Sequence, residues 1–461
     1  MEQSNRPQQL HNLPSSSVID WSKYEPKFYL HLDDRVHIEH VKSKIQDPNW
    51  VSSHAFFPSI HFNITFNKYV TTSNDKKLPK EQRKQKKKKV REIYYAAHKD
   101  RFIYKYYGDI LNSSYNEYAQ NNGINEIAIA YRNNKSGRNN IDFAYEVFDF
   151  LLSQNQAIVI SIDFTSFFDY IDHRNLKQNI KSVLGVKELP TDWYKVFKNL
   201  TQFTYVNKSD IDEFLKNKYG VKKLKKLIKT QKLTKIMSPK EFRSFKKEHL
   251  YKNKKTYGIP QGSGMSAVCS NVHLIHFDQE MIKWASEYNA LYRRYCDDLI
   301  LVIPVDRANT QKVELLKEEV IQIINSYQSH GLKIQEEKTE IRLYSEGKVF
   351  DENQLQSTLD YLGFVTDGHT IKIREKSLFK YYSRAYRKAN TSKRTAYVTK
   401  RKGPRKKLYK IYSHLGFNYK GRGNFITYAY RAHDKMKNLK AKSIIRNQVK
   451  RHWNKIHRRL E

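Results

Sequence analysis

The stretches AIVISIDF at residues 157–164 and YRRYCDDLILVIP at residues 292–304 decide how this chain folds. Both are short apolar runs rich in β-branched residues, which is typical of buried strands. The first run reaches Asp163 near its end. The second is interrupted at Cys296-Asp297-Asp298, which predicts two strands joined by a tight turn.

Apolar residues recur at helical spacing around these strands. The spacing predicts helices over 165–183, 266–288 and 310–327, and a further strand is expected over 332–343. The resulting order, β-α-(α)-ββ-α-β, is that of a ferredoxin-like sheet. Many unrelated proteins share this order, so function has to be argued from the side chains.

The composition indicates a polyanionic partner. The chain has 461 residues, with 85 Lys and Arg against 47 Asp and Glu, a formal net charge of +38. Apolar residues at 39% and aromatic residues at 13% argue against disorder of the whole chain. The excess charge is concentrated in 76–91, 222–255 and 372–461, and the last of these holds 29 basic and three acidic residues. Within it we expect a charged linker over 389–407 and a final amphipathic helix from about 433 to 460.

Cysteine usage and hydropathy exclude several classes of protein. Cys269 and Cys296 are the two cysteines, too few for a disulfide framework or a Cys-rich zinc module. The first residues lack the apolar core of a signal peptide, and no run of 18 apolar residues occurs. We therefore expect a cytoplasmic protein that does not enter a membrane.

Three carboxylates suggest a metal site. Asp163 closes the first strand, and Asp297 and Asp298 lie at the predicted hairpin turn. In a ferredoxin-like sheet these strands can be neighbours, and carboxylates brought together repel one another unless cations neutralise them. Oxygen ligands suit Mg²⁺ or Mn²⁺, and two such ions can drive phosphoryl transfer. The alternative is that Asp163 caps a strand and that the two neighbouring aspartates form an ordinary turn.

Five motifs in order resemble those of reverse transcriptases, over roughly residues 85–370. They are SIDFTSFFDYIDH (161–173), similar to the first metal-binding motif; GIPQGSGMSAVCSN (258–271), similar to the PQG motif; YCDD (295–298), similar to the YxDD hairpin; LKIQEEKTEI (332–341), similar to the Lys-bearing strand; and LDYLGF (359–364), similar to the primer-grip hairpin. One such string is weak support, whereas five in order favour the two-metal interpretation.

The resemblance implies a role for each matching residue. It places Asp163, Phe164, Asp297 and Asp298 at two metal ions, with Asp298 as the supporting acid. Lys338 would protonate the departing pyrophosphate as a general acid, although a lysine in EEKTE can equally be solvated.

Nucleotide-binding residues follow from the same resemblance. Phe168 occupies the position of a steric gate against a ribose 2′-hydroxyl, and the alternative is a core phenylalanine. Phe164, Gln261 and Gly262 would line the nucleotide site, because a glycine lets the backbone come close.

Further residues would contact the triphosphate or template and the primer. Arg91 and Arg132 lie in the fingers position, where guanidinium groups match phosphates, and the alternative for each is a surface ion pair. Tyr361, Leu362 and Gly363 would hold the primer end.

The implied fold class is α+β, a right-hand polymerase with fingers, a ferredoxin-like βαββαβ palm and a basic helical thumb. The expected divisions are an N-terminal extension (1–75), fingers (76–156), a palm (157–370) with a basic insertion of short helices or a loop at about 208–255, and a basic helical thumb or RNA-binding C-terminal region (371–461).

Absent features narrow the class of reverse transcriptase. The basic end has too few acids for an RNase H domain, and two cysteines do not suit a Cys/His endonuclease. NIDFA in the fingers segment and Asp367 after Val-Thr depart from the retron pattern. The sequence is most similar to bacterial defence-associated, unknown-group reverse transcriptases, relatives of the group II intron and retron enzymes. The resemblance implies dNTP substrates, a DNA product, a structured noncoding RNA template, a role against phage and, in some members, priming from a protein hydroxyl.

Two other functions stay open at this stage. One is a noncatalytic RNA-binding scaffold with a polymerase-like fold, and the other is a template-independent or RNA-synthesising nucleotidyltransferase on the same palm. The basic tail is also compatible with a homo-oligomer assembled around RNA.

Overall fold

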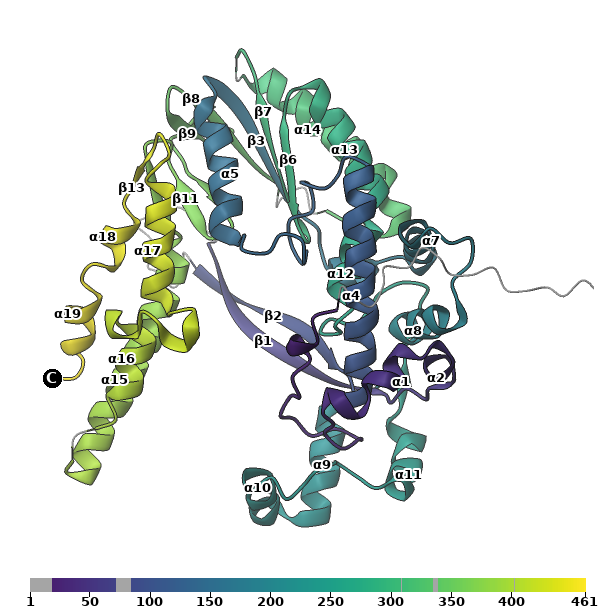
Figure 1. The fold of residues 1–461 in the computed structure, drawn as a ribbon. Coiled ribbons are helices and arrows are strands. Elements are labelled where there is room, and N and C mark those ends of the chain that lie inside the picture. Colours follow the sequence, from purple (N-terminus) through teal and green to yellow (C-terminus); the bar gives the residue numbers. More distant parts are fainter. Residues whose placement is uncertain (1–18, 72–83, 308, 335–338, 402) are drawn as a thin grey trace, which may run out of the picture. The chain divides into compact units, whose positions relative to one another are not determined.

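The chain forms two compact units, each built from several stretches of sequence. The computed structural model describes residues 19–71, 84–307, 309–334, 339–401 and 403–461 (Figure 1). The first unit combines Met1–Asn134, Phe164–Gln279 and Ile324–Lys333, and the second combines Lys135–Asp163, Glu280–Ile323 and Ile334–Glu461. The predicted domain boundaries at 75, 156 and 370 stay a prediction.

An antiparallel sheet of five strands organises the second unit. Its order is β6-β7-β3-β8-β9, and every neighbouring pair is antiparallel. The strands are β3 (Gln156–Asp163), β6 (Leu291–Tyr295), β7 (Asp298–Pro304), β8 (Glu340–Ser345) and β9 (Lys348–Phe350). Without the edge strand β9, the second, third, first and fourth strands in chain order lie side by side. This is the ferredoxin-like order, and the α+β class predicted from the sequence is confirmed.

The helices predicted from the apolar spacing are present, with two interruptions. Helix α14 (Thr310–Ser326) is continuous, whereas the helix predicted over 266–288 divides into α12 (Ser266–His273) and α13 (Ile275–Glu287). The helix predicted over 165–183 likewise divides into α6 (Phe167–Tyr170) and α7 (His173–Leu184), because Asp172 caps the second piece by accepting from the backbone of Asn175. The strand predicted over 332–343 is represented by β8, which begins at Glu340, and residues 335–338 lie outside the described part of the chain.

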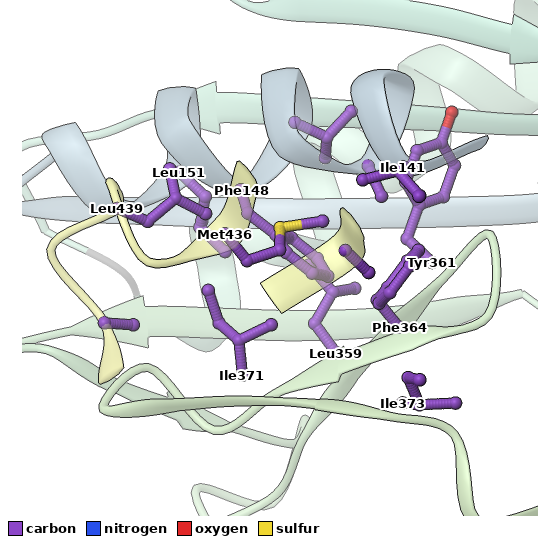
Figure 2. Packing of buried hydrophobic residues seen from close by; sticks show 14 of the residues in the cluster. Ile141, Phe148, Leu151, Leu359, Tyr361, Phe364, Ile371, Ile373, Met436 and Leu439 are labelled. Carbon is purple, nitrogen blue, oxygen red and sulfur yellow. The ribbon is translucent and has the colours of Figure 1, made fainter. Parts of the chain in front are cut away.

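One apolar core joins helix α5 (Asn140–Ser153) to the sheet and to the C-terminal segment (Figure 2). Phe148 and Leu151 of α5 belong to it, as do Phe364 and Met436. The C-terminal elements with residues in this core are β10 (Leu359–Tyr361), β11 (Phe364–Thr366), β12 (Thr370–Ile373), α15 (Glu375–Thr399), α17 (Phe425–Met436) and α18 (Ile445–Val449). Strand β13 (Lys442–Ser443) pairs with β12. The basic C-terminal region therefore packs against α5 and the sheet through one shared core.

Two predictions for the C-terminal region are wrong. The expected linker starts inside helix α15 (Glu375–Thr399), which continues because Ala389 and Ser392 are buried. The expected final helix is interrupted between α17 and α18, since β13 pairs with β12 there. The side chain of Gln448 also accepts a hydrogen bond from the backbone N–H of Ile373 and donates one to its carbonyl. The remaining helices are α16 (Lys406–Tyr412) and α19 (His452–His457).

The first unit contains a four-stranded sheet of order β2-β1-β4-β5. Its strands are β1 (Ser59–Thr71), β2 (Lys84–Tyr95), β4 (Thr204–Asn207) and β5 (Tyr251–Lys252), and its other helices are α1 (Lys42–Gln46), α2 (Pro48–Ser53), α4 (His98–Asn121) and α8 (Thr191–Thr201). The basic insertion forms the short helices expected for it, α9 (Lys208–Tyr219), α10 (Val221–Lys229) and α11 (Pro239–His249). No helix within the described residues is long and apolar enough to cross a membrane.

Replacing Phe364 tests whether the shared core stabilises the second unit. Phe364 is fully buried in that core, so Phe364→Ala should cost about 3–5 kcal/mol of unfolding free energy. The matched control is Phe379→Ala in α15, because that ring is 75% exposed. Denaturant unfolding checks both, and equal stabilities of the two variants would contradict the packing described.

Candidate active site

Asp163 and Asp298 face each other across neighbouring strands of the second unit. Asp163 ends β3, Asp298 begins β7, and the two are direct partners in the antiparallel register. Directly opposed residues share one face of a sheet, with their Cβ atoms about 5 Å apart. Asp298 is exposed and Asp163 half-buried. The sequence-based expectation that these strands are neighbours is confirmed.

A two-residue turn places Asp297 next to this pair. Tyr295 pairs with Asp298, so Cys296 and Asp297 alone connect β6 to β7. Cys296 adopts a φ of 62°, the left-handed conformation that tight hairpin turns require. Beneath the turn, the fully buried Arg294 donates from Nη1 to the carbonyl oxygen of Cys296 at 3.0 Å. The conformation of the turn is therefore fixed from inside the fold.

The carboxylates lie on the face of the sheet that carries the large core. Val159 and Ile300 belong to that core, and because side chains alternate along a strand, Asp163 and Asp298 share their face. Carboxylates this close repel one another, and an all-oxygen set of ligands suits Mg²⁺ or Mn²⁺. Within the described part of the chain, no group of three or more His, Cys, Asp or Glu side chains is gathered closely enough to hold an ion. The arrangement fits a divalent cation as an opposed pair with a third carboxylate beside it.

The predicted primer-grip residues form a second tight turn in the same unit. Leu362 and Gly363 connect β10 to β11 with φ values of 46° and 94°. The carbonyl of Leu362 accepts from the side chain of Asn140 at 3.0 Å, and the carbonyl of Gly363 accepts from the backbone of Arg374 at 2.9 Å. This turn is therefore held between the start of α5 and the start of α15.

Tyr361, the residue before this turn, has a buried hydroxyl without a hydrogen-bond partner among the described residues. Burial is the main reason why the pKa of Tyr361 lies far above its usual value, and the charge of Asp298 raises it further. The positive charge of Arg293 acts in the opposite direction. Tyr361 thus stays a neutral hydroxyl that can donate a hydrogen bond, within the electrostatic influence of the carboxylate site.

The PQG loop belongs to the first unit and is fixed by backbone contacts. The carbonyl of Gln261 accepts from the backbone of Tyr94 at 3.0 Å, and the backbone of Ile259 donates to the carbonyl of Phe168 at 2.9 Å. Gly262 has a φ of 113°, and a Cβ there would lie 2.7 Å from the carbonyl oxygen of Tyr94. The glycine is required for the loop to lie against β2.

The two phenylalanines assigned to the nucleotide site differ in exposure. Phe164 is buried and packs against Phe167 and Phe277, so its ring belongs to the interior of the first unit. Phe168 is half-buried in α6, with its ring 5.8 Å from that of Phe167. Of the two rings, Phe168 has the exposure that contact with a substrate needs.

Arg91 and Arg132 lie in different environments. Arg91 is exposed on β2, with its guanidinium carbon 5.7 Å from the centre of the Phe66 ring. Arg132 is buried, and its guanidinium donates to Asn116, to Asn125 and to the carbonyl of Ala128. Arg132 therefore holds its own loop together, whereas Arg91 is open to a ligand. Lys338 lies outside the described residues.

Comparison with protein families shows to which family the chain belongs. Residues 79–366 match the family model described as reverse transcriptase (RNA-dependent DNA polymerase). The chain belongs to this family. The enzyme class and the right-hand polymerase fold predicted from the sequence are confirmed, and the carboxylates, the PQG loop and the turn of Leu362 and Gly363 in this reverse transcriptase all lie within the matched residues.

Solved structures similar to this reverse transcriptase include two telomerases and a viral polymerase. The C-terminally truncated telomerase of Candida tropicalis gives a TM-score of 0.38 at 12% identity, covering 72% of this chain and 59% of that one. The telomerase of Candida albicans in complex with a fragment of telomeric RNA gives 0.39 at 13%, covering 91% and 66%. The RNA-dependent RNA polymerase of a human picobirnavirus gives 0.33 at 12%, covering 68% and 43%.

The chain thus spans less than two thirds of the length of each of these three proteins. The search of curated proteins found no match.

Sequence reasoning missed residues that hold this reverse transcriptase's site in place. Arg294 and Asn140 fix the two turns, and Glu146 of α5 binds Arg293 of β6 and Arg138. Arg294 could have been found from the sequence, because it lies two residues after the buried Tyr292 and therefore on the same inward face of β6. A charged residue at an inward position of a strand needs a partner, and here the turn provides one.

Substituting Gly262 tests the close approach of the PQG loop to β2. Gly262→Ala should lower the unfolding free energy by about 1–3 kcal/mol, since the new Cβ overlaps a backbone oxygen that cannot move freely. Gly137→Ala is the control, because Gly137 also has a positive φ but a Cβ there would have no neighbouring atom within 4 Å. Thermal unfolding measures the stability of both variants. An equal loss of stability would mean that the strain of a positive φ, and not the contact with Tyr94, accounts for the whole effect.

Proposed function

We propose that this chain synthesises DNA on an RNA template by two-metal phosphoryl transfer. The observation that carries the proposal is the opposed pair Asp163 and Asp298, with Asp297 in the adjoining turn, inside a domain of the reverse transcriptase family. This strand register brings acidic groups together, and their mutual repulsion costs free energy. Such an arrangement is expected where bound cations act on a polyanionic substrate.

The carboxylates would hold two Mg²⁺ ions, or Mn²⁺. Asp163 and Asp297 would be the principal ligands, Asp298 the supporting acid, and Phe164 would contribute through its backbone, since its ring is buried. When bound, the ions would favour the deprotonated primer 3′-hydroxyl and neutralise charge on the leaving pyrophosphate. The oxygen of that hydroxyl forms the new bond to the α-phosphorus as the bond to pyrophosphate breaks, and Lys338 would give the pyrophosphate a proton.

The residues assigned to the nucleotide site from the sequence would select and orient the incoming dNTP. Gln261 and Gly262 would line the site with backbone that is held against β2. Phe168 would exclude a 2′-hydroxyl by its half-exposed ring. The exposed Arg91 would contact the triphosphate or template, and Arg132 would support the fingers from within, because its donors are already engaged.

The turn of Leu362 and Gly363 would hold the primer end, and Tyr361, whose hydroxyl is buried, would support that turn from within the core. The two anchored carbonyls of the turn support this role, because they keep the hairpin from moving with the primer. The basic C-terminal helices would bind nucleic acid near that end, with Lys and Arg beside exposed rings such as Phe379 and Tyr397.

The biological setting is part of the proposal. Similarity to defence-associated reverse transcriptases favours a structured noncoding RNA as template and a role against phage. A charge of +38 suits a stable complex with such an RNA, alone or as a homo-oligomer. Priming from a tyrosine hydroxyl of the chain is one route to a first nucleotide, and 33 tyrosines are present.

Asp297→Asn tests the metal role of the turn carboxylate. Loss of one charge at the ions should lower the primer-extension rate ~100-fold or more, equivalent to several kcal/mol of transition-state stabilisation. Asp306→Asn is the control, because Asp306 is exposed just beyond the other end of β7. Extension by the wild type should stop in EDTA and return with Mg²⁺. Unchanged activity of Asp297→Asn would refute the assignment.

Phe168→Ala tests the steric gate. Removing the ring should raise the use of ribonucleotides relative to deoxynucleotides, since nothing then blocks the 2′-hydroxyl. The ratio of the two kcat/KM values, measured on one preparation, is independent of how much protein is active. A ratio equal to that of the wild type would remove Phe168 from the nucleotide site.

Sequencing of copurified nucleic acid tests the template and separates the enzyme from a scaffold. The protein is purified from cells that carry its native locus, as wild type and as Asp297→Ala/Asp298→Ala. We expect one RNA with both proteins and complementary DNA only with the wild type; DNA that stays with protein in phenol would add protein priming. RNA with both proteins and no aspartate-dependent DNA, even during phage infection, would favour the noncatalytic scaffold.

A further inference from the structure

A cleft of about 480 Å³ in the first unit is lined mainly by basic and amide side chains. Arg174 lies in the first turn of α7. Lys252 ends strand β5, and Lys254 and Lys255 follow it directly. All four side chains are exposed, and none forms an ion pair with another described residue. Their charges are available to a ligand.

The walls of this cleft are held rigidly. The side chain of Asn253 donates to the carbonyl of Thr201 at 2.8 Å and to that of Tyr257 at 3.2 Å. His173 donates its backbone N–H to Thr256 at 3.0 Å, and its Nε2 lies 2.7 Å from the carbonyl oxygen of Gly258. The cations are therefore carried by a fixed segment and not by a free loop.

Two aspartates lie near these cations, and neither forms an ion pair with one of them. Asp172 lines the cleft, but one of its oxygens accepts from the backbone of Asn175 at 2.7 Å as the cap of α7. The pKa of Asp169 is raised, chiefly by burial and also by Glu92, although the charge of Lys255 lowers it. The pKa of His173 is lowered by burial, so this ring adds hydrogen bonding and no charge at neutral pH.

Aromatic rings flank the cations along the same segment. Tyr251, 40% exposed, stacks on Tyr205 with ring centres 5.4 Å apart. Tyr257 stacks on Tyr170 at 5.7 Å, and Nζ of Lys333 lies 3.8 Å from the centre of the Tyr170 ring. The two rings thus lie at the two ends of the row of lysines in LYKNKKTY, residues 250–257. Tyr257 is half-buried, and Nζ of Lys255 lies 5.3 Å from the centre of its ring.

We propose that this cleft binds single-stranded nucleic acid, with backbone phosphates at Arg174, Lys252, Lys254 and Lys255 and bases on Tyr251 and Tyr257. Phosphate needs the cations, and unpaired bases stack on any exposed ring regardless of sequence. A single nucleotide would not need two ring platforms at opposite ends of a row of lysines. The cleft is formed by residues of the first unit alone, and the proposal does not rest on the proposed polymerase activity.

Charge reversal in the cleft tests the proposal on the full-length protein. Binding of labelled 12-nucleotide oligo(U) and oligo(dT) is measured in EDTA without dNTPs, so an inactive polymerase leaves the test intact. Lys254→Glu/Lys255→Glu should raise Kd ~10-fold and flatten the slope of log Kd against log salt by about 1.4, for two lost phosphate contacts. Lys44→Glu/Lys187→Glu is the control with the same change in net charge, because both lysines are exposed and Lys187 lies beyond the opposite end of α7. Equal weakening by both double variants would overturn the site.

Photocrosslinking locates the strand. Oligonucleotides with 4-thiouridine or 4-thiothymidine should attach to peptides containing Tyr251 or Tyr257 in the wild type and the control, and much less in the cleft variant. Crosslinks that never include either tyrosine would overturn the proposal. Displacement of the oligonucleotide by inorganic triphosphate at an equal concentration of phosphate groups would also overturn it, since the cleft would then take a small polyphosphate.

Discussion

The register between β3 and β7 is the constraint on which the candidate active site depends. A shift of one residue would turn Asp163 to the opposite face of the sheet and away from Asp298. The register is fixed by burial on both faces, because Val159 and Ile300 pack on one side and Ile160 and Leu301 are fully buried on the other. The apolar core thus determines where the carboxylates lie, although it makes no contact with a substrate.

The two turns likewise owe their conformation to residues that are not expected to contact a substrate. Burying a guanidinium costs several kcal/mol unless it is well hydrogen-bonded, and Arg294 donates to the carbonyl of Cys296. Asn140 likewise holds the carbonyl of Leu362, while Asn139 and Asp142 form the capping box of α5. Each turn that presents functional groups is therefore tied to an element with a large buried face.

The sequence predicted those features that depend on local pattern. Short apolar runs rich in β-branched residues identified β3 and β7, which are buried on both faces, and the helical spacing identified α14, which is buried along one face. The final helix was mispredicted since β13 and Gln448 satisfy backbone groups of β12, a long-range contact that helical periodicity does not reveal. The partners of Arg132 were missed for a similar reason: a buried arginine and an exposed one have the same sequence signal, and only Asn116 and Asn125 distinguish them.

Net charge alone does not determine where a polyanion binds to this protein. At physiological ionic strength the field of an exposed charge falls off within about 8 Å, so +38 spread over the surface favours encounter more than position. Binding of a polyanion at one defined place requires cations on a rigid backbone, next to groups that recognise something other than charge. The segment around Asn253 meets both conditions, because its hydrogen bonds fix the lysines and its ends carry stacked tyrosines. Lys222 and Lys223 in α10 carry the same charge, but no described ring is stacked beside them. A nucleic-acid strand attracted by the overall positive charge would thus bind in a defined place at the cleft. The basic helices of the insertion would attract it without fixing its position.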